Sequence, residues 1–334
     1  MPQNKKLDPV SLPMPMRFDE EPTTEFLNDL DSLRIELVDH PTPQQMREVA
    51  WRYVKATWAD APDLTNPVLN NISQVEMMEN LEDVLCFRAL PTPMEIFSFT
   101  FLFSGIDLQT VTHLIRHRAG SFAAQCTGDR FLHHEPCLVP SAVENSPEFY
   151  ERWKRHVEDG KKLYADMVDT KKISMMDART ILPKSLSTFY YGRFNLKDII
   201  GFVKQRSDKQ IQPSVDNIIA AKMAFEIIKV LPEASAVIGS KTLTSPAWHY
   251  IKNLRAGTGT NLYWPDSDSE EHLEYHPNDT IYQCHRYDLN GTNPPNEEWG
   301  GNTKFRQHWD KLVQDIRFLE GHYRDFLEGK NSLD

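Results

Sequence analysis

The sequence has few cysteines and no long apolar run. Its 334 residues include four cysteines, Cys86, Cys126, Cys137 and Cys284, without C-x-x-C spacing or the density of a small disulfide scaffold. The longest strongly apolar run, residues 97–106, is about half of the roughly 20 residues that a membrane helix needs. Residues 1–28 lack the apolar core of a signal peptide. We therefore expect a soluble protein of the reducing cytoplasm, with no membrane partner.

Positive charge is also scarce. The chain has 37 basic against 48 acidic side chains, a formal net charge of −11. Such a balance gives no general electrostatic attraction to nucleic acid or to an anionic membrane, so sequence-specific DNA binding is disfavoured. An anionic ligand must therefore be held by a local cluster of basic side chains.

The composition divides the chain into three parts. Residues 1–28 are rich in proline and predict an extended N-terminal arm. Residues 29–235 carry the helix and strand patterns and predict the main domain. Residues 236–334 predict a C-terminal extension that is rich in loops and ends in an amphipathic helix.

Local patterns predict the secondary structure within the main domain. Residues 34–39 alternate apolar and polar side chains like a half-buried strand, and residues 187–194 are rich in Thr, Phe and Tyr. Helices are expected from Pro43, over about 94–103 and 108–117, from Pro147, over 177–182, from Asn195 to Arg206, and from Pro213 to Val230. The helix from Pro147 is expected to turn Phe149, Trp153 and Val157 inward, and the one ending at Val230 is expected to be amphipathic.

A regular apolar stripe follows Thr303. Its members recur at alternating spacings of four and three residues: Phe305, Trp309, Leu312, Ile316, Leu319, Tyr323 and Phe326. This pattern predicts an amphipathic helix docked on its own core, with a contact between subunits as the alternative.

Arginines gather in three places in this acidic chain. Arg116 and Arg118 are followed by Arg130, Arg179 precedes Leu182-Pro183, and Arg206 follows an apolar stretch. Any one of them alone is typical of a helix end or a salt bridge. Several converging guanidinium groups bind phosphate well and therefore indicate a nucleotide or another phosphorylated ligand. The sequence has no Gly-rich dinucleotide fingerprint and no phosphate-binding loop, so side chains must grip such a ligand.

The order of these blocks resembles a known family. Arg116-His117-Arg118, then Ala178-Arg179-Thr-Ile-Leu182-Pro183, then Asn195-Leu196, and finally Arg206 and Gln212 are similar to the flavin-dependent thymidylate synthases. The resemblance covers about residues 33–232 and includes Thr92-Pro93-Met-Glu95. It implies an α+β fold, a mixed α/β subunit with long helices packed on a sheet. It also implies a homotetramer whose active sites are built from several subunits.

The resemblance also implies roles for individual residues. FAD would be held by Thr92, Arg116, His117, Arg118, Asn195, Lys197 and Gln210. A uridine nucleotide, dUMP or UMP, would be held by His113, Cys126, Arg130, Arg179 and Arg206. Arg206 would be the catalytic residue, because its fixed positive charge can stabilise the enolate-like charge that develops when hydride reaches C6. Methylenetetrahydrofolate and NADPH would be the other reactants, and no metal is implied.

The chain departs from the family's pattern at several of these positions. Cys126 stands where the family has Ser, and Arg130 comes two residues later than the family's Arg. Lys197 replaces an Arg and Gln210 replaces a His. Further departures are Leu90, Ala123-Ala124 and Gly201.

Two hypotheses describe the role of Cys126. A thiolate beside arginines has a lowered pKa and could add to C6 of uracil as a nucleophile. The flavin route needs no such nucleophile, so we favour a small, partly buried packing or phosphate-loop residue.

The C-terminal extension holds the weaker candidates. His272, Glu274 and His276 alternate and could ligate zinc from one face of a strand, but a solvated acidic loop is favoured. The pair Cys284-His285 has the same reading, and Tyr263-Trp264-Pro265 is either a rim for a flat ligand or a packed turn.

The leading functional prediction is reductive C5 methylation of dUMP to dTMP. Two alternatives remain open. One is a related UMP or dUMP methylase or hydroxymethylase of a nucleoside-modification pathway, and the other is a nucleotide-binding homologue that is catalytically silent.

Overall fold

The structure is a computed structural model that describes residues 24–58, 71–87, 92–117, 120–128, 130–207, 215–244 and 303–332. Its centre is a four-stranded antiparallel sheet in the order β2-β3-β6-β4. These strands are β2 (Arg34–Asp39), β3 (Ser98–Asp107), β6 (Ser187–Asn195) and β4 (Ser121–Ala124). A separate parallel pair joins β1 (Phe26–Asn28) to β5 (Cys137–Val139). Helices packed on an antiparallel sheet confirm the expected α+β class and the strands at 34–39 and 187–194.

Strand β3 occupies a segment for which a helix was expected. The helix over about 94–103 is wrong, because only α4 (Thr92–Ile96) is helical there and β3 follows it. Phe99, Phe101 and Phe103 recur at every second position and are all fully buried. A helix would spread these rings around its circumference, whereas a strand points them to one face. The two-residue period therefore decided the structure, not the apolar content.

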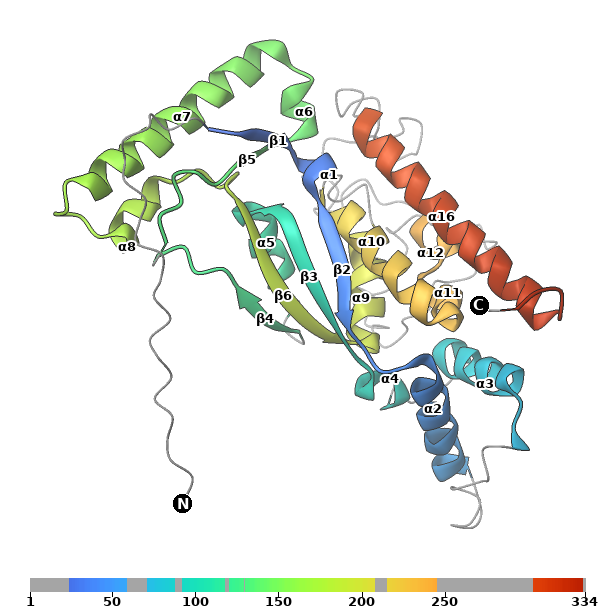
Figure 1. Ribbon diagram of the computed structural model, residues 1–334. Coiled ribbons are helices and arrows are strands. Elements are labelled where there is room, and N and C mark those ends of the chain that lie inside the picture. The colour runs from blue at the N-terminus through green and yellow to red at the C-terminus, as the bar shows by residue number, and fades with distance from the viewer. Residues whose placement is uncertain are drawn as a thin grey trace, which may run out of the picture.

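Helices cover one face of the sheet (Figure 1). α5 (Leu108–Leu114), α9 (Leu196–Arg206) and α10 (Val215–Val230) pack against its strands. On β6 the residues on the covered face are buried, whereas Phe189 and Tyr191 on the opposite face are 40% and 45% exposed. One face of the sheet is thus the core face and the other is open in this chain.

Helix α10 is buried on nearly all sides, so the expectation of an amphipathic helix is wrong. It contacts β2, α9 and α16 (Thr303–Leu327). Even Asp216 and Asn217 in its first turn are buried. Buried polar groups need hydrogen-bond partners, so Asp216 and Asn217 require polar groups of neighbouring elements to lie close to this turn.

The remaining helices surround this centre. They are α1 (Asp29–Ser32), α2 (Pro43–Trp58), α3 (Gln74–Phe87), α6 (Ser141–Glu144), α7 (Pro147–Asp169), α8 (Met175–Ala178), η3 (Arg179–Ile181), η4 (Pro232–Ala234), α11 (Ser235–Ile238) and α12 (Ser240–Thr244). In α7, Val157 is buried and Trp153 packs edge-on against Phe26, as expected. Phe149 is 58% exposed, contrary to expectation, because the small apolar cluster under α7 reaches Trp153 but not the first turn. No described helix is long and apolar enough to cross a membrane.

The C-terminal stripe forms the expected helix and docks on the chain's own core. Helix α16 lies along α10 and α12 (Figure 1). Its residues Phe305, Trp309, Ile316 and Tyr323 are buried, the first three within the same cluster as the sheet. Residues of α11 and α12 join that cluster too. The segments after residue 235 therefore complete the core that the preceding segments begin.

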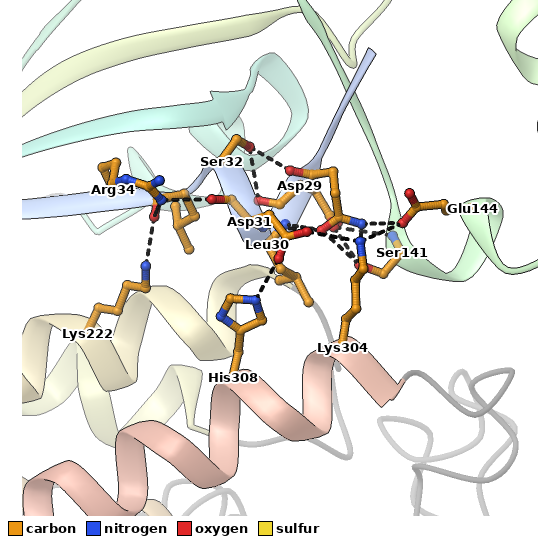
Figure 2. A network of polar contacts seen from close by, with 12 residues as sticks. Asp29, Leu30, Asp31, Ser32, Arg34, Ser141, Glu144, Lys222, Lys304 and His308 are labelled. Carbon is orange, nitrogen blue, oxygen red and sulfur yellow. Dashed lines mark hydrogen bonds and ion pairs between the residues drawn. The ribbon is translucent and has the colours of Figure 1, made fainter.

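A polar network fixes the start of α16 to the start of the fold (Figure 2). Lys304 Nζ lies 2.9 Å from Asp31 and 3.1 Å from Glu144, and His308 Nε2 lies 3.0 Å from Asp31. On the other side of the same network, Asp29 Oδ1 accepts hydrogen bonds from the backbone N–H and the hydroxyl of Ser141. Helix α16 thereby links α1 to α6 by charge while its apolar side covers α10.

Two side chains of α16 test the value of its packing. Ile316 is fully buried and Phe318 is 73% exposed. We expect Ile316→Ala to lower the free energy of unfolding by about 2–5 kcal/mol, because it leaves a cavity against the core. Phe318→Ala, the control, should change it by less than about 0.5 kcal/mol. Urea unfolding measures both, and equal midpoints for the two variants would contradict the docking described here.

Asp29 predicts a pH dependence of stability. Burial raises the pKa of Asp29 from 3.8 to about 6, although the Ser141 hydrogen bonds oppose this. The folded chain therefore binds this proton more tightly than the unfolded chain, and the resulting stability is lost as the pH rises through about 6. Asp29→Asn keeps an acceptor for Ser141 without the charge. We expect it to be more stable than wild type by about 3 kcal/mol at pH 8, but by less than about 1 kcal/mol at pH 4. Urea unfolding at both pH values measures this, and a difference independent of pH would rule the explanation out.

Candidate functional site

The C-terminal end of α9 holds the central residue of the candidate site. Asn195 caps the helix, with its Oδ1 accepting from the backbone N–H of Asp198 at 2.8 Å. Its apolar face is buried in the core through Ile199, Ile200, Phe202 and Val203. Arg206, in the last turn, is therefore projected from a rigid element, with 15% of its side chain exposed.

Each nitrogen of the Arg206 guanidinium has a partner in a different place. Nε donates to Nε2 of His117 at 3.2 Å, and Nη2 donates to the backbone carbonyl of His113 at 3.2 Å. Nη1 lies 3.3 Å from Oδ2 of Asp216. Asn217 also donates to the backbone carbonyl of Arg206 at 2.6 Å. The plane of this guanidinium is thus defined from α5, from the turn after it and from α10.

His113 completes this cluster. Its Nδ1 lies 3.3 Å from the same Asp216 Oδ2, and its Nε2 lies 3.1 Å from the side-chain amide of Gln109. A neutral ring with the proton on Nδ1 satisfies both contacts, donating to Asp216 and accepting from Gln109. Asp107 caps α5 by accepting from the backbone N–H of Thr110, which fixes the helix that carries His113.

His117 is uncharged in this arrangement. Burial, and then the positive charge of Arg206, lower the pKa of His117 from 6.5 to about 4. Its Nε2 accepts the Arg206 hydrogen bond, and its ring meets Phe202 edge-on at 4.6 Å. At neutral pH His117 is therefore a hydrogen-bond acceptor with a flat apolar side, while Arg116 beside it is exposed.

A second group of expected residues lies around the loop after β4. Arg179, at the start of η3, donates to the hydroxyl of Thr127 at 3.0 Å. A Cβ at Gly128 would collide with Met176 and press on Arg179, so glycine permits this close approach. Arg130 is exposed. Cys126 is exposed as well, so the expectation of partial burial is wrong, because edge strand β4 ends before it.

A third group lies at the opposite end of α9. Lys197 pairs with Glu95 of α4 at 2.6 Å, and Thr92 is exposed at the first position of α4. Asn195 is occupied as the cap described above. Helix α9 has 11 residues and is about 16 Å long, which separates this group from Arg206. One chain therefore brings His113, His117 and Arg206 together but leaves Thr92, Asn195 and Lys197 at a distance.

Several expected residues lie outside the part of the chain that the structure describes. Arg118 and Gln210 are among them, as are the candidate zinc ligands His272, Glu274 and His276. The Cys284-His285 pair and Tyr263-Trp264-Pro265 also lie there. Within the described ranges, no group of three or more His, Cys, Asp or Glu side chains is arranged to hold a metal ion.

Two further residues of this cluster, Asp216 and Gln109, are not among those predicted from the sequence. Asp216-Asn217 stands at the start of the apolar segment VDNIIAAKMAF. An acid followed by an amide in such a segment is the signal that could have located the partner of a buried arginine. An amphipathic helix would place Asp216 and Asn217 at the surface, whereas both are buried.

Comparison with known proteins supports the family resemblance that the order of the arginine-containing segments indicates. A family model described as thymidylate synthase complementing protein matches residues 36–233. The chain belongs to the flavin-dependent thymidylate synthase family. A flavin-dependent thymidylate synthase of Pyrococcus furiosus is 24% identical over 201 residues, covering 59% of this chain and 80% of that protein. One of Nitratidesulfovibrio vulgaris is 25% identical over 224 residues, covering 62% of this chain and 87% of its own.

Solved structures share the fold. The UMP/dUMP methylase PolB from Streptomyces cacaoi, bound with 5-Br dUMP, aligns with a TM-score of 0.52 and 19% sequence identity, covering 63% of this chain and 94% of that one. The match to the family model ends at residue 233, so α11, α12 and α16 all lie beyond it.

Proposed function

We propose that this chain is a flavin-dependent enzyme that reductively methylates C5 of a uridine monophosphate, converting dUMP to dTMP. Family membership supports a flavin-dependent enzyme. The observation that carries the proposal is the fixed Arg206 guanidinium, held beside His117 at the end of a rigid helix. A permanent charge in a largely buried place suits a negative charge that develops on a flat ring.

The donor set fits a flavin with phosphates. Arg116 is exposed and has no ion-pair partner among the described residues, so its guanidinium is available to an anion. His117 offers a neutral acceptor and a flat ring beside it. We assign FAD to Arg116 and His117 with Arg118, and to Thr92, Asn195, Lys197 and Gln210. When bound, reduced flavin supplies hydride, methylenetetrahydrofolate supplies the carbon, and NADPH restores the reduced flavin.

The nucleotide is assigned to the other two groups. Arg130 and Arg179 would bind its phosphate, with Cys126 on the same loop. His113 and Arg206 would lie against the pyrimidine. Arg206 would then stabilise negative charge on the ring oxygens as hydride reaches C6. Because the expected ligands are spread over separate places in one chain, we propose a homotetramer in which neighbouring subunits complete each site.

A second candidate is methylation or hydroxymethylation of UMP in a nucleoside-modification pathway. Two observations favour it. The structural neighbour PolB is a UMP/dUMP methylase, and the loop carrying Cys126 and Arg130 departs from the family's pattern. This loop lies beside Arg179, where a nucleotide phosphate and sugar would sit.

The function is tested with purified protein supplied with FAD, NADPH, methylenetetrahydrofolate and either dUMP or UMP. Mass spectrometry of the nucleotide product identifies the sugar that is accepted and separates a methyl from a hydroxymethyl group. A protein that binds dUMP without flavin and without turnover is a silent homologue, and the proposal is then wrong.

Arg206→Lys tests the electrostatic role. Lysine keeps the charge but loses the planar fork that the three partners fix. We expect bound FAD and its reduction by NADPH to be retained, while product formation falls roughly 10²-fold. Flavin absorbance follows the first two steps, and product mass follows the third.

Arg193→Lys is the matched control, because Arg193 is exposed and pairs with Asp39 on the surface. Normal turnover by Arg206→Lys, or parallel loss of flavin reduction and methylation, would assign Arg206 to a structural ion pair instead.

A further inference from the structure

One carboxylate oxygen links two residues of the candidate site. Asp216, the second residue of α10, is 1% exposed. Its Oδ2 lies 3.3 Å from Nη1 of Arg206 and 3.3 Å from Nδ1 of His113. The roles assigned above to binding and catalysis do not use this carboxylate.

The position of Asp216 is itself rigid. Helix α10 is packed against β2, α9 and α16, so its first turn moves only with the core. Ionised carboxylates are costly to bury unless charged groups or hydrogen-bond donors surround them. Arg206 and His113 supply both, and in return their side chains are held from a fixed point.

We propose that Asp216 is a positioning residue, which holds the Arg206 guanidinium against His117 and orients His113 toward the same place. The proposal rests on the proposed function for its consequence in catalysis, but the contacts themselves are independent of any reaction.

Electrostatics alone would argue against a carboxylate at this place. Its negative charge reduces the positive charge that Arg206 offers to a developing anion. If Asp216 did nothing but set the local potential, its removal would speed the reaction. A positioning role predicts a slower reaction. Removing the charge of Asp216 would strengthen the attraction between Arg206 and the developing anion, but a misplaced guanidinium would weaken that attraction by more.

The pKa of His117 distinguishes a positioning role of Asp216 from a purely electrostatic one. Its low pKa is caused by burial and by Arg206, while the charge of Asp216 acts in the opposite direction. If Arg206 stays in place after Asp216→Asn, the pKa of His117 falls below about 4, since only a negative charge has been removed. If Arg206 moves away, His117 loses a positive neighbour and a hydrogen bond, and its pKa rises from about 4 toward 6.5.

The experiment is hydrogen–deuterium exchange at the C2 position of histidine, followed by mass spectrometry of the full-length chain over a pH series. We expect Asp216→Asn to raise the pKa of His117. Glu226→Gln is the matched control, because Glu226 lies on the same helix and pairs with Lys229 at the surface. An unchanged or lowered pKa in Asp216→Asn would overturn the proposal. An equal rise in Glu226→Gln would also overturn it, since any lost carboxylate on α10 would then have the same effect.

A second variant covers the case in which Asp216→Asn does not fold. Asp216→Glu keeps the charge but moves the shared oxygen by one methylene. We expect product formation to fall about tenfold or more in Asp216→Glu, with reduction of bound FAD by NADPH retained. Turnover of Asp216→Glu at or above the wild-type rate would overturn the proposal. If wild type itself makes no product, the proposed function fails, and the His117 measurement still decides whether Asp216 positions Arg206.

Discussion

The burial of α10 on nearly every side is the constraint on which the rest of the structure depends. Inside a core, each polar group needs a partner, and α10 carries Asp216 and Asn217 in its first turn. Arg206 contacts both of them: its guanidinium pairs with Asp216, and its backbone carbonyl accepts a hydrogen bond from Asn217. Further along the helix, Lys222 donates to the carbonyl of Leu33 at 2.7 Å. The C-terminal ends of α9, α5 and α1 therefore lie where they can provide partners for the polar side chains of the buried helix α10.

Much of the fold could be predicted from local pattern, and the failures share a cause. Strand β6 and helices α9 and α16 follow from alternation, capping and an apolar stripe, all of which are properties of neighbouring residues. The helix expected at 94–103, the solvent face expected for α10 and the buried position expected for Phe149 depended on what lies opposite in space. Composition does not contain that information, because high apolar content alone favours a buried helix and polar residues alone favour the surface.

The candidate site was predicted in part. The order of the arginine blocks was enough to identify the family and to single out Arg206, His117 and His113, which the structure brings together. It could not show that Thr92, Asn195 and Lys197 lie at the far end of α9, because spacing along the chain does not give distance in space. Nor could it show Asp216, whose importance arises only when α10 packs beside α9.

The helix that covers α10 is synthesised long after α10 itself. Lys304 and Asp31 are 273 residues apart in the sequence, and the family match ends at residue 233. During synthesis, α10 leaves the ribosome well before α16 exists to cover it. Contacts of such long sequence separation slow folding and leave apolar surface open to other chains. For this chain the period of greatest aggregation risk lies between completion of the sheet and synthesis of α16.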